Sequence, residues 1–382
     1  MKSDHNWLVA AFMVVILMGT SLGTCFWPSD DSEEGFSVSG SVIGLSSYNQ
    51  PKTDMVAEDL FDRGAELGST FTITTEGGVY HDAILFEEYQ GIFMYDIFVN
   101  IETDGYVSIG CVGELITADE GSQVTLTYTG TSERYQKETQ YTKGYTDVRS
   151  DYPSDEVFAN FYEVTGGDLK DDILYRSFSS LYAPEKQSRS TYVNDLAEEA
   201  GIQYLIALSY NDKSVKDATD RLDGYCITLC KEGKYIAPSM GYLYIQQKEK
   251  TKAVMESILD NDGAYLVHCN VGRDRTRFVI LLLQALCNCT PDEMKECEAA
   301  AFCNLYNIDV GSKEYETVVD CTYTRNMYFI AYPEKISDVF EIDWDTVNVD
   351  SVDTYSAAYS FCTDYLGLTD EEVSGIQQRL CG

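Results

Sequence analysis

Positively charged residues are scarce in this sequence of 382 residues, where 27 Lys and Arg stand against 63 Asp and Glu and the formal net charge is -36. A surface of this sign repels nucleic acid and anionic lipid headgroups, so we expect no nucleic-acid partner. An anionic ligand can still bind where a few local positive groups outweigh the overall field. A compact motif that contains arginine is therefore more informative here than in a basic protein.

Histidine is also rare, and the chain contains only His5, His81 and His268. The twelve cysteines therefore form no Cys/His pattern with the spacing of zinc ligands. Most of the cysteines fall on apolar helical or strand patterns, which predicts buried free thiols. We expect neither a metal nor another cofactor.

Long hydrophobic runs are nearly absent, apart from "WLVAAFMVVILMG" at residues 7–19. This run is short for a membrane span and typical of the apolar region of a secretory signal peptide. Lys2 precedes it, and Ser21 and Gly23 stand at plausible cleavage positions. "LGTC", which ends at Cys25, resembles a bacterial lipobox whose cysteine carries a lipid, and an uncleaved signal anchor is the third alternative. All three predict export, with the protein secreted or attached to the cell surface through its N-terminus.

The rest of the chain is long enough for two domains with different rhythms. The first shows apolar and polar residues in alternation, with a turn at Asp104-Gly105 and a short helix expected at residues 53–64. In the second, helices alternate with buried strands, which predicts an α/β domain with a mainly parallel sheet flanked by helices. The predicted boundaries are a signal peptide at 1–24, a linker at 25–35, a β-rich accessory domain at 36–146 and the α/β domain at 151–382.

The motif "VHCNVGRDRTR" at residues 267–277 lies between a short buried strand, "AYLVH", and a nearly all-apolar helix, "TRFVILLLQALC". Ligands bind at such junctions in α/β sheets, and a helix N-terminus favours an anion. A cysteine there, Cys269, faces Arg275 and the helix dipole, which lowers its pKa and makes it a thiolate nucleophile. The planar fork of Arg275 can grip two phosphoryl oxygens, and the Thr276 hydroxyl can donate a hydrogen bond to the sulfur.

The loop that follows the cysteine can surround a tetrahedral anion with its backbone N–H groups. Gly272 permits a backbone conformation that other residues resist. Asp274 could protonate the leaving oxygen and later activate water. The expected phosphate-binding residues are His268, Asn270, Val271, Gly272, Arg273 and Thr276, and the expected catalytic residues are Cys269, Asp274 and Arg275.

His268-Cys269, five residues and then Arg275-Thr276 resemble the signature of the cysteine-dependent protein tyrosine phosphatase superfamily, in the "HCxxGKDRTG" form of an atypical bacterial branch. "NFYEVTGGDLKDDILYRSFSSL" at 160–181 and "AGIQYLIALS" at 200–209 are also similar to segments of the family's catalytic domain. The resemblance covers residues 151–382. It implies a phosphatase-like fold and hydrolysis of phosphate monoesters, most of all protein phosphotyrosine, through a phosphocysteine intermediate. It also implies Cys269 as nucleophile, Arg275 as phosphate clamp and Asp274 as the acid.

The sequence departs from that branch at several positions. Arg273 replaces a Lys that is thought to bind substrate charge, and Arg277 replaces a Gly that allows close packing of the first helical turn. Arg176, in "LYRS", is either adjacent to the site or part of a structural ion pair. The two extra arginines leave open an inositol-polyphosphate or phosphoinositide phosphatase.

A further departure concerns the strand "LIALS", where Ala207 and Ser209 stand in place of the family's Asp and Arg. Asp212 is a candidate substitute for that acid. The missing acid leaves open an inactive phosphate-binding module. A third alternative is that the β-rich domain performs the main function by binding a cell-wall or host ligand.

Overall fold

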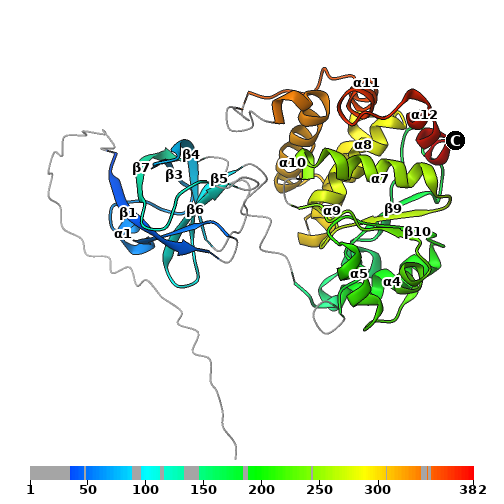
Figure 1. The fold of residues 1–382 in the computed structure, drawn as a ribbon, viewed down its shortest axis with the longest axis horizontal. Coiled ribbons are helices and arrows are strands. Elements are labelled where there is room, and N and C mark those ends of the chain that lie inside the picture. Colours follow the sequence, from blue (N-terminus) through cyan, green and yellow to red (C-terminus); the bar gives the residue numbers. More distant parts are fainter. Residues whose placement is uncertain are drawn as a thin grey trace, which may run out of the picture. The chain divides into compact units, whose positions relative to one another are not determined.

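The computed structural model describes most of the chain after residue 34 (Figure 1). The described residues are 35–46, 49–87, 96–111, 116–132, 146–183, 188–241, 244–306, 308–336, 342 and 346–382. The predicted signal peptide, the lipobox and nearly all of the linker lie outside these residues, so export stays a prediction. No helix within the described ranges is both long and apolar enough to cross a membrane.

The N-terminal part folds into a closed barrel with the strand order β1-β2-β6-β5-β4-β3-β7. Its strands are β1 Ser37–Leu45, β2 Pro51–Val56, β3 Ser69–Thr75, β4 Gly78–Glu87, β5 Ile97–Ile101, β6 Tyr106–Cys111 and β7 Gln123–Thr131. Alternate strand residues point inward and fill the barrel with an apolar core that includes Phe71, Leu85, Val99 and Leu126.

Two local predictions in this part have different outcomes. The turn at Asp104-Gly105 does join β5 to β6, and Gly105 has a φ of +81°. The helix predicted at 53–64 is wrong at both ends, because residues up to Val56 belong to β2, residues 62–64 form a turn and only Ala57–Phe61 form α1. Thr53 is buried and its hydroxyl donates to the Val107 carbonyl at 2.8 Å. This contact joins β2 to β6, two strands that are neighbours in the barrel but far apart in the sequence, and it outweighs the local helical pattern.

The C-terminal part contains a five-stranded sheet with the order β11-β10-β12-β9-β8. The strands are β8 Tyr162–Glu163, β9 Leu174–Ser177, β10 Tyr204–Ala207, β11 Tyr235–Ile236 and β12 Tyr265–His268. β12 pairs in parallel with both β9 and β10, β10 pairs in parallel with β11, and β8 is antiparallel to β9. The predicted mixed α/β architecture is confirmed.

Helices pack on both faces of this sheet (Figure 1). They are α3 Asp155–Ala159, α4 Arg189–Glu199, α5 Asp212–Thr219, α6 Tyr225–Lys231, α7 Lys248–Asp260, α8 Asp274–Leu286, α9 Pro291–Tyr306, α10 Lys313–Ala331, α11 Thr354–Ser360 and α12 Asp370–Leu380. The structure also contains the single-turn elements η2 Arg149–Asp151, η3 Tyr244–Gln246 and η5 Phe361–Tyr365.

The central strand β12 is buried on both sides. Tyr265 and Val267 face one core, which includes residues of α7 and α8, whereas Leu266 faces a second core built with α4 and α6. Successive side chains of a strand point to opposite faces, so a strand whose residues are all buried must be packed against other elements on both faces. β12 therefore ends in the interior of the domain, and the residues that follow it start from a rigid support.

A disulfide joins Cys287, directly after α8, to Cys381, directly after α12, with a Cα–Cα distance of 5.9 Å. The prediction of buried free thiols is wrong for this pair, because 94 residues separate its members and only the fold brings them together. The other described cysteines whose side chains can be assessed are free, and most of them are buried.

Candidate active site

The loop at residues 269–275 connects the end of β12 to the first turn of α8. Gly272 in this loop has a φ of +70°, a region that favours glycine. A Cβ atom at this position would also overlap the backbone carbonyl of Ser177 at the end of β9. Glycine is therefore required here for two independent reasons, and only the first of them could be expected from the sequence.

The carbonyl groups of three successive loop residues point away from the centre of the loop into the surrounding protein. The hydrogen bonds are Ser179 N to Asn270 O at 3.1 Å, Asn160 Nδ2 to Val271 O at 3.2 Å and Arg176 Nη2 to Gly272 O at 2.9 Å. In a trans peptide the N–H points opposite to the carbonyl of the preceding residue. The N–H groups of residues 271–273 are thus directed into the loop, where they can converge on an anion.

Cys269 lies at the base of this loop and is 1% exposed. Burial acts to raise the pKa of its thiol. The positive charge of Arg275 and the hydroxyl and N–H groups of Thr276 lower the pKa by more than burial raises it, so the net pKa is below the ordinary value. The N-terminus of α8 adds a favourable dipole. The structure therefore places the predicted nucleophile, the clamp and the hydroxyl donor together.

Arg275 is 9% exposed and its Nη1 donates to the carbonyl of Met240 at 3.1 Å. This contact fixes part of the guanidinium against the segment that precedes α7. Its positive charge also lowers the pKa of the Cys269 thiol. The role of Arg275 as phosphate clamp stays a prediction, and its planar guanidinium suits that role.

His268 is fully buried and neutral, because burial lowers its pKa to about 4. Its Nδ1 lies 3.1 Å from the Cys269 carbonyl oxygen, and its Nε2 lies 3.3 Å from the hydroxyl of Ser180. These contacts fix the His268 ring next to the Cys269 backbone, and they give His268 a structural role in positioning the cysteine.

Asp274 forms a two-pronged ion pair with its neighbour Arg273, with N–O distances of 3.0 and 3.1 Å. Burial acts to raise the pKa of Asp274, but the charges of Arg273 and Arg277 lower it below the ordinary value. Without substrate, Asp274 is therefore an ionised carboxylate. This state suits a base or an orienting group, and proton donation requires that substrate binding first releases the ion pair.

Arg273 is held by more than Asp274. Its guanidinium lies over the rings of Phe302 and Tyr306 on α9, at 5.3 and 5.8 Å from their centroids, and it also donates to the Tyr306 hydroxyl. The side chain is 25% exposed, so part of its charge remains accessible to an anionic substrate. The geometry of this arginine is thus fixed on three sides.

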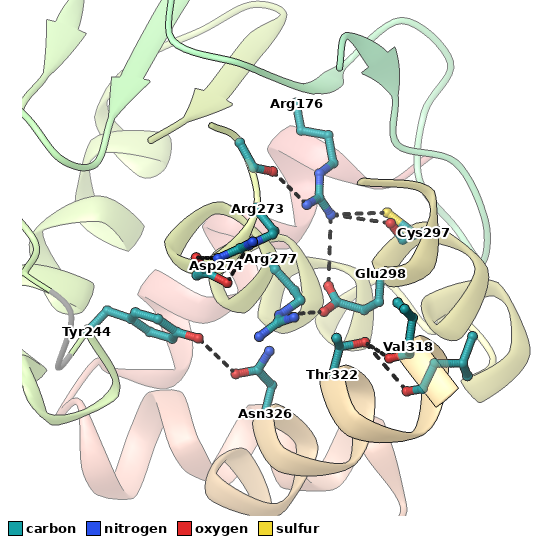
Figure 2. Close-up of polar contacts among 12 residues, drawn as sticks. Arg176, Tyr244, Arg273, Asp274, Arg277, Cys297, Glu298, Val318, Thr322 and Asn326 are labelled. Carbon is teal, nitrogen blue, oxygen red and sulfur yellow. Dashed lines mark hydrogen bonds and ion pairs between the residues drawn. The ribbon is translucent and has the colours of Figure 1, made fainter. Parts of the chain in front are cut away.

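The Arg277 side chain points toward Glu298 on α9 (Figure 2). Its side chain is 5% exposed, its Nε forms an ion pair with Glu298 Oε2 at 3.1 Å, and its guanidinium packs over Phe302. The first turn of α8 forms normally, since the N–H of Arg277 bonds to the Arg273 carbonyl at 3.1 Å. A contact between Arg277 and substrate, which would have favoured polyanionic ligands, is not supported.

At the position of the missing acid, β10 carries Ala207. Ala207 is buried and pairs with His268 across β10 and β12, and Asp212 lies at the start of α5, where Tyr235 donates to its carboxylate at 3.2 Å. Asp274 is the carboxylate whose charge acts on the Cys269 thiolate. The substitution of Asp212 for the family's acid is therefore not supported by its position.

Sequence reasoning missed Tyr210, which lies three residues after the end of β10. Its hydroxyl lies 2.8 Å from the Ser179 hydroxyl and its ring packs edge-on against His268. Burial raises its pKa, and the charges of Cys269 and Arg275 also act on it. It therefore borders the site, and no local sequence signal distinguishes it from the many other tyrosines.

Within the described residues, no group of three or more His, Cys, Asp or Glu side chains is arranged to hold a metal ion. The positive charge at the site comes from Arg275, Arg273 and the N-terminus of α8. Any stabilisation of a bound anion by the described residues therefore rests on guanidinium groups and backbone amides.

Residues 231–382 match the model of a family described as the tyrosine phosphatase family. This segment contains the 269–275 loop and α8, and the match supports a phosphatase-like region of the cysteine-dependent tyrosine phosphatase type. No curated protein matches the chain.

Two solved structures show limited similarity. An uncharacterized conserved protein from Thermotoga maritima is 11% identical over 24% of this chain and 35% of its own, with a TM-score of 0.22. The core catalytic domain of the PP-IP phosphatase SIW14 from S. cerevisiae, in complex with citrate, is 15% identical over 50% of this chain and 96% of its own, with a TM-score of 0.27. The chain thus spans 35% of the length of the first of these.

Proposed function

We propose that the protein is an exported phosphatase that hydrolyses phosphate monoesters, with protein phosphotyrosine as its substrate class, through a phosphocysteine intermediate. The observation that carries this proposal is the orientation of the 269–275 loop. Its carbonyls bond outward to the surrounding protein, so its N–H groups face a thiol whose pKa is lowered by Arg275. Such a ring of donors above an ionised sulfur is suited to a phosphoryl group.

In the first step the Cys269 thiolate attacks phosphorus, the S–P bond forms and the ester P–O bond breaks. The phosphoryl oxygens lie against the loop amides and Arg275, which stabilise the added negative charge. The leaving alkoxide or phenolate takes up a proton from solvent. In the second step Asp274 accepts a proton from water as its oxygen attacks phosphorus, the S–P bond breaks and the thiolate leaves, aided by the Thr276 hydroxyl. One water is consumed, and an alcohol or phenol and inorganic phosphate are produced.

The state of Asp274 limits the range of leaving groups. Because this carboxylate is ionised and paired with Arg273, it does not readily supply the proton that an alkoxide leaving group needs. A phenolate is a much better leaving group, since tyrosine has a pKa of about 10. This favours aryl phosphates such as phosphotyrosine over phosphoserine, phosphothreonine or inositol phosphates.

One alternative retains support from a specific observation. The ion pair of Asp274 with Arg273 is also what an inactive phosphate-binding module would contain, since such a module needs the anion site without an acid. The inositol-polyphosphate or phosphoinositide alternative has lost one of its two reasons, because Arg277 is buried against Glu298.

Export is supported by the disulfide between Cys287 and Cys381, since disulfides persist in oxidising compartments. The apolar segment at residues 7–19 supports the same proposal. Fractionation of cells that produce the full chain, combined with N-terminal sequencing and mass spectrometry of Cys25, decides between a secreted, a lipidated and an anchored protein.

The decisive experiment measures hydrolysis of a small aryl phosphate by the purified protein and by Cys269→Ser. We expect turnover by the former only, and a phosphorylated Cys269 peptide after rapid acid quench. Activity that survives the substitution would exclude the thiolate mechanism, whereas phosphopeptide binding without turnover would establish the inactive module.

A further inference from the structure

Behind the loop lies a buried ionic cluster of two arginines and one carboxylate (Figure 2). Arg176 and Glu298 are both fully buried, and the Arg277 side chain is 5% exposed. Glu298 lies between the two guanidinium groups, with N–O distances of 3.9 Å to Arg176 and 3.1 Å to Arg277. Burial raises the pKa of Glu298 to about 7, against the lowering effect of Arg277 and Arg176, so above that pH a single carboxylate serves two buried positive charges.

Both arginines are connected to the 269–275 loop or to the first turn of α8 that follows it. Arg176 donates to the carbonyl of Gly272 at 2.9 Å and so fixes the loop at its most constrained residue. Arg277 projects from the first turn of α8, and its charge acts on Asp274, three residues before it. Any displacement of either guanidinium is therefore transmitted to a group that faces the anion.

Helix α9 supplies two of the partners of Arg277, and the Tyr244 side chain of η3 is a third. Glu298 and Phe302 lie one turn apart on α9, and they provide the counter-charge and the ring over which the guanidinium packs. The next turn contributes Tyr306, which binds Arg273. One face of α9 thus holds the side chains of two loop-proximal arginines.

We propose that Glu298 is a positioning residue of the active site: it neutralises Arg176 and Arg277 together, so that Arg176 holds the Gly272 carbonyl and Arg277 leaves the Arg273–Asp274 pair undisturbed. This inference rests on the proposed function of the loop. Glu298 touches neither the sulfur nor the anion, and it acts through the two arginines.

Loss of the carboxylate leaves two like charges buried side by side, and repulsion then drives them apart. Arg176 is held against the Gly272 carbonyl, and Asp274 is the other carboxylate whose charge acts on Arg277. We expect one or both of these contacts to change. Removal of the Arg277 charge in the same variant relieves the repulsion and leaves Arg176 in place.

The test compares Glu298→Gln with the double variant Arg277→Met/Glu298→Gln, using aryl phosphate hydrolysis at a temperature where circular dichroism shows both folded. We expect kcat/KM to fall by about 10- to 100-fold in the single variant, as for a misplaced catalytic group, and to recover to within about fivefold of wild type in the double variant. Glu293→Gln, which removes a capping carboxylate from the same helix, is the matched control and should keep the wild-type rate.

A single variant that loses thermal stability but keeps kcat/KM overturns the inference, because Glu298 is then only a structural ion pair. A double variant that is no better than the single one overturns it as well. If Glu298→Gln does not fold, the double variant alone decides, since the inference requires it to fold and to be active.

If wild-type protein does not hydrolyse the ester, the proposed enzymatic function fails, and calorimetric titration with inorganic phosphate then replaces the rate measurement. The inference predicts weaker phosphate binding in the single variant and recovery in the double variant. Absence of phosphate binding by the wild type overturns both proposals.

Discussion

Replacement of Gly272 by alanine should damage the active site far more than an equivalent change elsewhere. A φ of +70° costs a non-glycine residue about 1–2 kcal/mol. The added Cβ would also overlap the Ser177 carbonyl, a backbone group that cannot rotate away. The loop has to move by about 1 Å to relieve the overlap, and a displacement of that size can lower the rate about 100-fold.

Gly367, between η5 and α12, is the matched control. It has a φ of +75°, but no heavy atom lies within 4 Å of an added Cβ. Gly367→Ala therefore carries the conformational cost alone, which corresponds to a decrease in Tm of about 2–8 °C at roughly 2–4 °C per kcal/mol. We expect it to keep the wild-type kcat/KM.

The assay is aryl phosphate hydrolysis by the two variants at 25 °C, with thermal unfolding recorded in parallel. The expected result is that kcat/KM falls about 100-fold in Gly272→Ala only. Equal kcat/KM values for the two variants would refute the reasoning, because the close approach of Gly272 to β9 would then have no bearing on the chemistry.

Three further results are expected. The acid limb of the pH–rate profile reports ionisation of Cys269: activity rises with pH and levels off above a pKa lower than that of an ordinary thiol, whereas a midpoint at or above the ordinary value contradicts the lowered pKa. Asp274→Asn should change aryl phosphate turnover by less than about tenfold, since the leaving phenolate needs little protonation, and a loss near the upper end of the general-acid range, about 10⁴-fold, would instead identify it as the acid. Cys381→Ser, which breaks the 94-residue link to Cys287, should lower the free energy of unfolding by about 4–5 kcal/mol with kcat unchanged at 25 °C, and an unchanged denaturation midpoint would argue that the disulfide does not form.

Much of the C-terminal part could be predicted from the sequence because its signals are local. The buried strand β12, the largely apolar helix α8 and the capping box of Thr369 with Glu372 each depend on residues close together in the chain. The helix predicted at residues 53–64 failed for the opposite reason. Pro51–Val56 pairs with β1 and β6, and these pairings are not visible from the segment itself.

The candidate site divides in the same way. Cys269, Arg275 and Gly272 belong to one short motif and could be predicted together. Their supports, Asn160 and Glu298, come from elements far away in the sequence, and nothing local marks them. The environment of Arg277 could not be predicted either, because whether an arginine in the first turn of α8 faces substrate or the interior depends on what α9 presents to it.

Helix α8 is fastened at both ends, by the loop hydrogen bonds before its first turn and by the Cys287–Cys381 bond after its last. It therefore acts as a rigid support, and the sulfur of Cys269 attacks every ester from the same direction. Selectivity among esters must then come from segments outside this loop and helix, such as the stretch around Met240 that touches Arg275. Engineering of this protein for a new ester substrate should therefore change that stretch and leave the 269–275 loop and α8 unchanged.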